Sequence, residues 1–447
     1  MTMHDVIIIG GGVTGAGTAR DCAMRGLKVL LFEKGSPGGA TTASSSHLIH
    51  GGLRYLLYDR LTTHTTCWDS GHIIRIAAPL LNRLPVIWPV YKGHAHGMTT
   101  VETLLEAYDG FQRMKGGLPH LRLSPEETLR LLPGLKRDGL VGAFSFDEWW
   151  VDPVALVTKN LDSAARYGAR VETGSAVTEI LRRDGKVCGV AAHGAEYPGR
   201  VVINASGPWV DKTARMAGLQ IPLRLQKGTH LCYRERLTPV GLILEAEGGG
   251  RYIFVLPSEQ GTLVGPTDIS APADPERVAT DPEEISYLLA SVKNYFAGFP
   301  DRYDSTIVGA RPILGQSGSE KLLSREFEVF DHAKRDGVEG LLTIGGGKLS
   351  DFRIMAEAVT DAACAKLGRA EPCRTAMETL AGGPLAERIS FPKPWRAVKS
   401  FLRHHPRLRE LHALAYLGAG LGRHLAREAL GRNRDSTAES FRGHYKA

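Results

Sequence analysis

The stretch Asp5-Val6-Ile7-Ile8-Ile9-Gly10-Gly11-Gly12-Val13-Thr14-Gly15 decides the fold, because an apolar run of strand type leads directly into a glycine-rich turn. Gly10 permits the tight turn, and Gly12 lets backbone N–H groups approach a phosphate. Gly15 lets the following helix pack close to the strand. The positive N-terminal end of that helix then faces the anion. The pattern therefore predicts a strand, turn and helix that receive a dinucleotide pyrophosphate.

The residues after this turn support the same interpretation. A helical pattern over residues 16–25 ends at Gly26, and a second apolar strand follows over residues 29–32. Glu33 closes that strand about 20 residues beyond the turn, where a carboxylate holds a ribose hydroxyl in dinucleotide-binding folds. The alternative is a glycine turn that connects strand and helix without a ligand.

Length and composition limit the class of protein. A chain of 447 residues exceeds the roughly 300 that one hydrophobic core supports, so at least two domains are expected. No apolar run approaches the ~18 residues of a membrane span, and the N-terminus has a strand pattern instead of a signal peptide, so we expect a cytoplasmic protein. The six cysteines are scattered without a C-x-x-C pair, which indicates neither a metal site nor a disulfide framework.

The formal net charge of +7 is concentrated in the tail. Residues 381–447 hold 13 Lys and Arg against five Asp and Glu, so the rest of the chain is nearly neutral. Such a tail could lie against the anionic inner face of a membrane, or it could be a solvated helical appendage. We favour the appendage, because three glycines at positions 418, 420 and 422 interrupt a sustained apolar stripe. No nucleic-acid partner is expected, because aromatic residues are not interleaved with the basic ones.

The order of the elements predicts an α/β protein with an interrupted architecture. A Rossmann-type cofactor domain with a parallel sheet is expected from residues 1–60, 150–215 and 335–380. Insertions over residues 61–149 and 216–334 are expected to build a mainly antiparallel substrate domain, and residues 381–447 a short, basic helical tail. Within the first insertion, Thr99 and Glu102 suggest a capping box at the start of a helix.

Several separate motifs carry a family resemblance. Together they resemble FAD-dependent glycerol-3-phosphate dehydrogenase, a family of the D-amino-acid-oxidase-like flavoproteins. The resemblance spans residues 4–375, and residues 331–373 look especially similar to the anaerobic branch of the family. The motifs are the N-terminal turn, ASSSHLIHGGLRYL over residues 43–56, KGTH over residues 227–230, GARP over residues 309–312, and GGKL over residues 346–349 with Arg353.

The resemblance implies a glutathione-reductase-type flavoprotein that binds FAD. It would oxidise sn-glycerol 3-phosphate to dihydroxyacetone phosphate, transfer hydride to flavin N5, and pass electrons to a quinone or respiratory acceptor. The residues expected to bind FAD are Gly10, Gly12, Val13, Thr14, Gly15, Glu33, Lys34, Thr42, Ser44, Ser45, Ser46, Leu48, Val177, Ala205, Gly207, Trp209, Gly346, Gly347, Lys348 and Leu349.

The resemblance also implies a catalytic set. Arg54, Arg311 and Arg325 stand at motif positions that the family uses in its site, and a guanidinium matches phosphate oxygens in a bidentate way. His50 and His230 are the candidate bases, because imidazole titrates near working pH. Lys348 stands at a helix start, where it would stabilise reduced flavin or orient the substrate.

The chain also departs from the family, and these departures leave alternatives open. Gly265-Pro266-Thr267-Asp268 and Ser350-Asp351-Phe352 differ from the family's runs near the predicted site, and no cysteine-rich extension follows Cys373. A related flavin oxidase or dehydrogenase for another 2-hydroxy acid or a secondary amine is the alternative activity. The electron acceptor, a homo-oligomer or partner subunits, and peripheral membrane contact also stay open.

Overall fold

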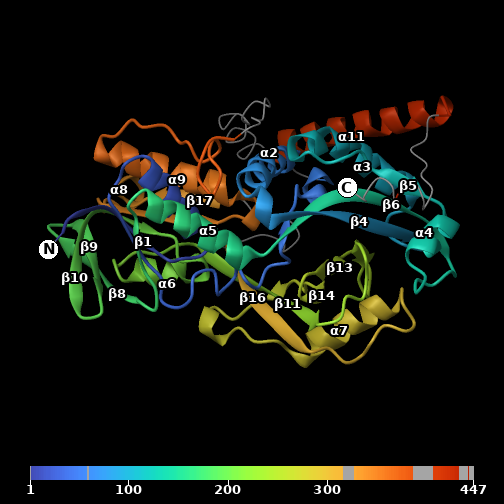
Figure 1. Cartoon of the computed structure of the whole chain (residues 1–447), viewed down its shortest axis with the longest axis horizontal. Helices are drawn as coiled ribbons and strands as arrows, with labels where there is room; N and C mark the ends of the chain where they lie inside the picture. Colours follow the sequence, from blue (N-terminus) through green and yellow to red (C-terminus); the bar gives the residue numbers. More distant parts are fainter. Residues whose placement is uncertain (1, 58–59, 316–326, 386–405, 432–440, 442–447) are drawn as a thin grey trace.

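The computed structural model describes residues 2–57, 60–315, 327–385, 406–431 and 441. Two sheets lie toward opposite ends of the elongated molecule, with the tail helix along one side of the second (Figure 1). No helix in this described part is both long enough and apolar enough to cross a membrane.

The first sheet is built from segments that are far apart in the sequence. Its strand order is β17-β18-β10-β1-β2-β7, with β8 and β9 joined through β10. The five strands from β18 to β7 run parallel, and β17 runs antiparallel at one edge. The bounds are β1 His4–Ile9, β2 Val29–Phe32, β7 Arg170–Glu172, β8 Val177–Arg183, β9 Lys186–Ala192, β10 Ala195–Asn204, β17 Phe327–Asp331 and β18 Leu341–Gly346.

Strand β1 lies at the centre because it is apolar on both faces. Ile8 belongs to the core shared with the helices α1 Val13–Met24, α5 Pro153–Arg166 and α9 Phe352–Leu367, whereas Ile7 packs toward the hairpin of β8 and β9. Gly17 brings α1 and α9 together, because a Cβ there would lie 2.9 Å from a ring carbon of Phe352. The short elements α6 Val210–Arg215, α8 His332–Asp336, η3 Gly207–Trp209 and η5 Leu349–Asp351 complete this half.

The second sheet has the order β15-β11-β14-β13-β12-β4-β6-β3, with β16 paired to β11 and β5 paired to β6. It is antiparallel except where β12 pairs with β4. Its strands are β3 Leu48–Ile49, β4 Leu81–Tyr91, β5 Leu121–Leu123, β6 Leu140–Val151, β11 Leu223–Tyr233, β12 Gly241–Glu245, β13 Tyr252–Ser258, β14 Gly261–Gly265, β15 Ile269–Ser270 and β16 Ser305–Leu314.

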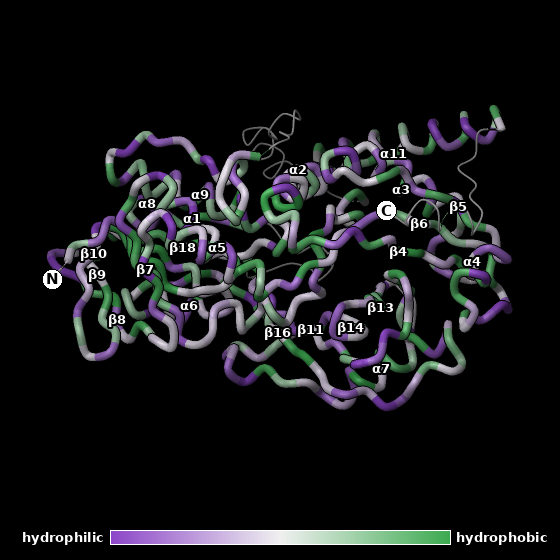
Figure 2. Tube along the Cα trace, in the orientation of Figure 1, coloured by the Kyte–Doolittle hydropathy of each residue, from purple (hydrophilic) through white to green (hydrophobic). Residues whose placement is uncertain are grey.

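Side chains alternate between two cores along this sheet, as the two-residue period of a strand requires. Trp88 and Ile243 belong to the core shared with α2 Arg60–Ile76 and α3 Met98–Lys115. Ile87 and Leu242, one residue away, belong to the core shared with α7 Pro282–Lys293 and the chain that follows α4 Pro125–Leu131. Figure 2 shows hydrophobic residues gathered along the strands. The remaining short helices are η1 Leu53–Leu57, η2 Ala78–Leu80 and η4 Pro275–Arg277.

The tail helix α11 Pro406–Ala429 packs along α3, so it is more than a solvated appendage (Figure 1). The Tyr416 hydroxyl donates to the Ala107 carbonyl at 3.0 Å, and His424 Nδ1 lies 3.4 Å from the Glu102 carboxylate. Gly420 lies where a Cβ would come 3.0 Å from the Thr103 carbonyl oxygen. A glycine that was expected to interrupt the apolar stripe therefore lets the helix approach α3 closely.

Candidate active site

A cavity of about 620 Å³ extends from the glycine turn after β1 to the second sheet. Its lining comes from the ends of β1, β10 and β18, from residues 36–50, and from strands of both sheets. The carboxyl ends of parallel strands are where open α/β sheets bind ligands. The cavity therefore lies where a dinucleotide and a second molecule can meet.

The turn after β1 is built so that only glycine fits. Gly10 has φ of 107°, and a Cβ there would lie 2.7 Å from the Ala205 carbonyl oxygen. A Cβ at Gly15 would lie 1.9 Å from the Gly10 carbonyl oxygen. Helix α1 begins after Gly12, which has no side chain to cap it, and its first turn holds no acidic residue; the Val13 amide donates to the Thr42 hydroxyl at 3.2 Å. Its positive end is therefore available to an anion in the cavity.

Glu33 at the end of β2 is fixed by backbone groups on both of its oxygens. Oε2 accepts from the Gly11 amide at 2.6 Å, and Oε1 accepts from the Gly35 amide at 2.8 Å. The carboxylate thus closes the glycine turn and lines the cavity at the same time. This placement suits a ribose hydroxyl beside the pyrophosphate turn.

The structure brings together all but one of the predicted cofactor residues. Gly15 lies beneath the turn and does not line the cavity. The residues that line it are Gly10, Gly12, Val13, Thr14, Glu33, Lys34, Thr42, Ser44, Ser45, Ser46, Leu48, Val177, Ala205, Gly207, Trp209, Gly346, Gly347, Lys348 and Leu349.

Glu276 also lines the cavity beside two of these residues, and no sequence motif pointed to it. It pairs with Lys34 at 2.5 Å and accepts from the Trp209 indole at 2.9 Å, while Lys34 lies 3.8 Å from the centroid of the Trp209 ring. Hydrogen bonding to Lys34 lowers the pKa of the Glu276 carboxyl. Residue 276 lies between β15 and α7, so this contact joins two segments that are 242 residues apart in the sequence.

The candidate base His230 is fully buried on β11 and lines the cavity. Its Nε2 lies 2.9 Å from the Ser46 hydroxyl. Burial, and next the positive charge of Arg311, lower the pKa of His230 to about 3. The imidazole is therefore neutral at working pH and can exchange hydrogen bonds, but it is a weak proton acceptor.

Of the three predicted arginines, Arg311 is the one whose side chain the structure describes. It lines the cavity from β16, with Nη1 3.1 Å from Asp268 Oδ1 and Nη2 3.2 Å from the Thr267 carbonyl oxygen. Arg54 belongs to η1, next to the cavity-lining Tyr55, but its side chain lies outside the described part. Arg325 lies outside the described residues altogether.

The motif residue Arg353 does not line the cavity. It is buried at the start of α9, where Nε donates to Asp69 at 2.7 Å and Nη1 donates to Glu357 at 3.0 Å. Asp69 also accepts from the Ile354 amide at 3.0 Å. The geometry gives Arg353 a structural role, tying α9 to α2.

Lys348 lines the cavity where β18 passes into η5. Its ammonium lies 2.7 Å from the Asp351 carboxylate and 4.9 Å from the centroid of the Tyr55 ring. Gly347 before it has φ of 81°, and a Cβ there would lie 2.3 Å from the sulfur of Met355. The turn thus presents backbone and one cation to the cavity.

Sequence reasoning missed an apolar wall of the cavity. Trp88 and Tyr252 pack edge to face with ring centroids 5.0 Å apart, and the Tyr252 hydroxyl lies 2.6 Å from His96 Nδ1. No local pattern could reveal this wall, because its members come from α3 and four strands. They are Trp88, Leu104, Phe146, Ile243, Tyr252 and Phe254.

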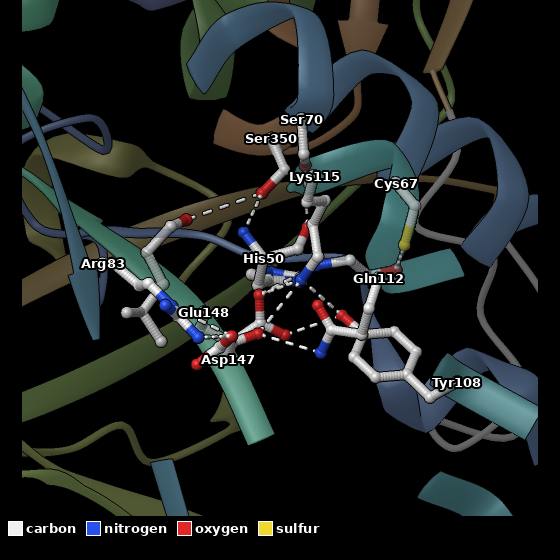
Figure 3. Close-up of polar contacts among 12 residues, drawn as sticks. His50, Cys67, Ser70, Arg83, Tyr108, Gln112, Lys115, Asp147, Glu148 and Ser350 are labelled. Carbon is white, nitrogen blue, oxygen red and sulfur yellow. Dashed lines mark hydrogen bonds and ion pairs between the residues drawn. The ribbon is translucent and has the colours of Figure 1, made fainter. Parts of the chain in front are cut away.

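Beside this wall, Glu148 on β6 connects the cavity to a buried polar network (Figure 3). Glu148 Oε2 lies 2.5 Å from the Lys115 ammonium, and Oε1 accepts from the Tyr108 hydroxyl at 2.7 Å. Burial raises the pKa of Glu148, and the adjacent Lys115 opposes that rise. Sequence reasoning missed this network too, because its members lie on separate elements.

Comparison with known proteins agrees with this geometry. Residues 5–350 match the family described as FAD dependent oxidoreductase. The aerobic glycerol-3-phosphate dehydrogenase of Staphylococcus haemolyticus is 31% identical over 412 residues, which are 87% of this chain and 72% of that protein. One subunit of the anaerobic glycerol-3-phosphate dehydrogenase of Escherichia coli K12 is 31% identical over 424 residues, or 90% and 76% of the two chains.

Solved structures share the fold. The FAD complex of glycerol-3-phosphate dehydrogenase from Bacillus halodurans has a TM-score of 0.68 at 24% identity and covers 97% of this chain and 81% of its own. Glycine oxidase from Bacillus cereus has a TM-score of 0.61 at 18% identity, with 87% and 100% covered.

Proposed function

The chain belongs to the FAD dependent oxidoreductase family, and from this premise we propose that it oxidises sn-glycerol 3-phosphate to dihydroxyacetone phosphate. The observation that carries the proposal is one cavity that holds both a dinucleotide turn and a set of cationic and imidazole groups. That set comprises His50, His230, Arg311 and Lys348. The relatives named glycerol-3-phosphate dehydrogenase support the choice of substrate.

The residues present fit FAD. The N-terminus of α1 and the turn at Gly10 and Gly12 would hold the pyrophosphate, and Glu33 would hold the ribose. The turn at Gly346 and Gly347 exposes backbone to the same cavity. When bound there, FAD supplies a hydride acceptor at N5.

The chain's own residues would bind the substrate and take its proton. Arg311 would hold the phosphate, because its guanidinium lines the cavity while Asp268 and backbone carbonyls fix its orientation. We assign the hydroxyl proton to His50, because it is the other candidate base that lines the cavity and the low pKa of His230 makes that group a weak base. His230, held by Ser46, would orient the hydroxyl, and the charge of Lys348 would favour the reduced cofactor.

Anaerobic reduction of the bound flavin tests this proposal. Glycerol 3-phosphate added to the yellow holoenzyme should bleach the flavin absorption, and His50→Gln should slow that bleaching by at least 100-fold. Glycerol has the hydroxyl groups but no phosphate, and L-lactate has a carboxylate in its place. If the site recognises the phosphate, neither compound should bleach the flavin. Bleaching by glycine or sarcosine with none by glycerol 3-phosphate would replace the proposal with an amine oxidase.

We propose further that a quinone accepts the electrons. The apolar wall with Trp88 and Phe254 supports this, because an uncharged ring can pack there next to the cofactor site. Reduced enzyme mixed with a short-chain quinone should regain its flavin colour at least tenfold faster than with dissolved oxygen. Equal rates with both would count against a quinone acceptor.

We propose that the outer face of α11 contacts the membrane. Leu411 and Leu414 are each 61% exposed and Leu425 is 52% exposed, within a tail that is strongly basic. The chain should sediment with phosphatidylglycerol vesicles, and Leu411→Ser with Leu414→Ser should reduce that binding. Val141→Ser, an exposed apolar residue on β6, is the matched control. Loss of a dimer without a change in vesicle binding would instead assign the face to a second copy.

A further inference from the structure

The loop over residues 50–52 joins β3 to η1 along the cavity, and His50 and Gly52 line it. Side chains from other elements bond its successive backbone groups (Figure 3). These contacts are the His50 amide to Ser350 Oγ at 2.9 Å, Ser70 Oγ to the His50 carbonyl at 3.1 Å, the Gly51 amide to Glu148 Oε2 at 3.3 Å, Cys67 Sγ to the Gly51 carbonyl at 3.6 Å, and Thr63 Oγ1 to the Gly52 carbonyl at 3.2 Å.

The loop is also confined sterically at its centre. A Cβ on Gly51 would lie 2.2 Å from the Tyr108 hydroxyl and 2.3 Å from Cys67 Sγ. Loops normally lie at the surface and are bonded to water. Here α2, α3, β6 and η5 hold the backbone from several directions, so the Cα of His50 has a fixed position.

Glu148 is the charged member of this set. Its carboxylate receives the Lys115 ammonium at 2.5 Å, the Tyr108 hydroxyl at 2.7 Å and the Gly51 amide at 3.3 Å. Lys115 is only 1% exposed, and it also donates to Tyr108 at 2.9 Å. A protein with an apolar pair of the same volume is often as stable as one with a buried ion pair. Stability alone therefore does not explain why this chain has the Lys115–Glu148 pair.

The network is suited to holding the loop and not to conducting protons. The third bond of Lys115 goes to the Asp147 backbone carbonyl at 3.3 Å, and the Tyr108 hydroxyl bonds to Glu148 and Lys115. Tyr108 thus donates its hydroxyl hydrogen to Glu148, and Lys115 donates to Glu148, to the Tyr108 oxygen and to backbone. The carboxylate in turn directs one oxygen at the loop amide.

We propose that Glu148, held by Lys115 and Tyr108, is a positioning residue that fixes His50 against the reacting substrate through the Gly51 amide. The inference rests on the proposed function, because it assumes that His50 accepts a proton in this cavity. A misplacement of about 1 Å can cost 100-fold in rate. Losing the acceptor at position 148 should therefore slow flavin reduction more than it weakens substrate binding.

Two double variants test this without leaving a buried charge. In E148L/K115M the acceptor for the Gly51 amide is lost, and we expect the limiting rate of flavin reduction to fall at least tenfold while the substrate Kd changes less than threefold. In E148Q/K115M an amide oxygen still accepts that bond, and we expect a rate within threefold of the wild type. FAD content and melting temperature establish that both variants fold.

The matched control replaces the ion pair between Asp147, the neighbour of Glu148 on β6, and Arg83 on β4. The Asp147 carboxylate pairs with Arg83 at 2.6 Å and accepts from the Leu118 amide at 2.8 Å, and among the described residues it forms no hydrogen bond to the loop, so D147L/R83M should keep a rate within twofold of the wild type. A normal rate in E148L/K115M would overturn the proposal. Equal impairment of E148Q/K115M and E148L/K115M would also overturn it, because charge and not the hydrogen bond would then matter.

A second readout does not depend on the substrate. Diethyl pyrocarbonate should modify His50 at least threefold faster in E148L/K115M than in the wild type or E148Q/K115M, as followed by peptide mass spectrometry. Unchanged reactivity would refute the positioning role. Absence of flavin bleaching by glycerol 3-phosphate in the wild type would instead refute the proposed substrate.

Discussion

Replacing His230 with Gln should make the protein more resistant to mild acid. His230 is 1% exposed, and its pKa is lowered to about 3, first by burial and then by Arg311. In the unfolded chain a histidine has a pKa of roughly 6.5. Below that pH the unfolded chain binds a proton at His230 that the folded state excludes. The free energy of unfolding therefore loses nothing through His230 above about pH 6.5 and decreases as the pH drops below it.

The size of this loss follows from the difference between the two pKa values. Each pH unit below the unfolded pKa costs about 1.4 kcal/mol until the folded pKa is reached. Between pH 7 and pH 5 the wild type should lose about 2 kcal/mol of unfolding free energy through His230 alone. Gln at position 230 does not titrate, and it can still bond to the Ser46 hydroxyl. The variant should escape this loss.

Urea unfolding of the holoprotein at pH 7 and pH 5, followed by near-ultraviolet circular dichroism, measures the effect. The quantity of interest is the difference between the two pH values for the wild type minus the same difference for His230→Gln. His193→Asn on an exposed turn is the control, and it should follow the wild type. A difference below about 0.5 kcal/mol would refute the reasoning, because a buried neutral imidazole requires about 2.

Three further outcomes are expected. Gly15→Ala should weaken FAD binding at least 100-fold, measured by flavin absorbance after gel filtration, because its Cβ would lie 1.9 Å from the Gly10 carbonyl oxygen; retained colour would count against the turn as the pyrophosphate site. Asp69→Asn should lower the free energy of unfolding by about 1.5–3 kcal/mol, because buried Arg353 then keeps only Glu357 of its two carboxylate partners, yet flavin reduction per bound FAD should stay within twofold. Arg311→Met should raise the Kd of glycerol 3-phosphate roughly 10- to 100-fold, as loss of a charge-assisted hydrogen bond of about 1.5–3 kcal/mol requires; an unchanged Kd in rapid-reaction titrations would remove Arg311 from phosphate binding.

The parts that could be predicted from the sequence are those that depend on neighbouring residues. The turn at residues 10–15 requires glycine for reasons that lie within one strand and one helix. The expected capping box at Thr99 and Glu102 was wrong, because α3 begins at Met98 after Gly97 without a side-chain cap. Glu102 on α3 is buried instead, 3.4 Å from Arg122 on strand β5. The Glu102 carboxylate thus forms a tertiary ion pair, although its spacing from Thr99 predicted a local contact at the start of a helix.

The substrate side could be predicted only through the resemblance, because its charges depend on distant partners. Arg311 was expected to bind a phosphate, and the structure places Asp268 3.1 Å from it across 43 residues. His230 was expected as a base, and burial on β11 lowers its pKa to about 3. Spacing in the sequence carries no information about the burial of an imidazole or about which carboxylate pairs with a guanidinium.

Different features of the chain determine the geometry of the two sides of the cavity, and the apolar wall depends on strand register. Strand pairing places Ile243 opposite Phe254, and Val86, two residues before Trp88, opposite Phe146. A shift of one residue in any of these pairings would turn the apolar side chains to the other face of the sheet. The cofactor side depends instead on backbone conformation at Gly10 and neighbouring residues, which such a shift would leave unchanged. Substitutions along one face of the second sheet can therefore reshape the apolar wall, where we propose that the quinone packs, while the glycine turn on the FAD side keeps its geometry.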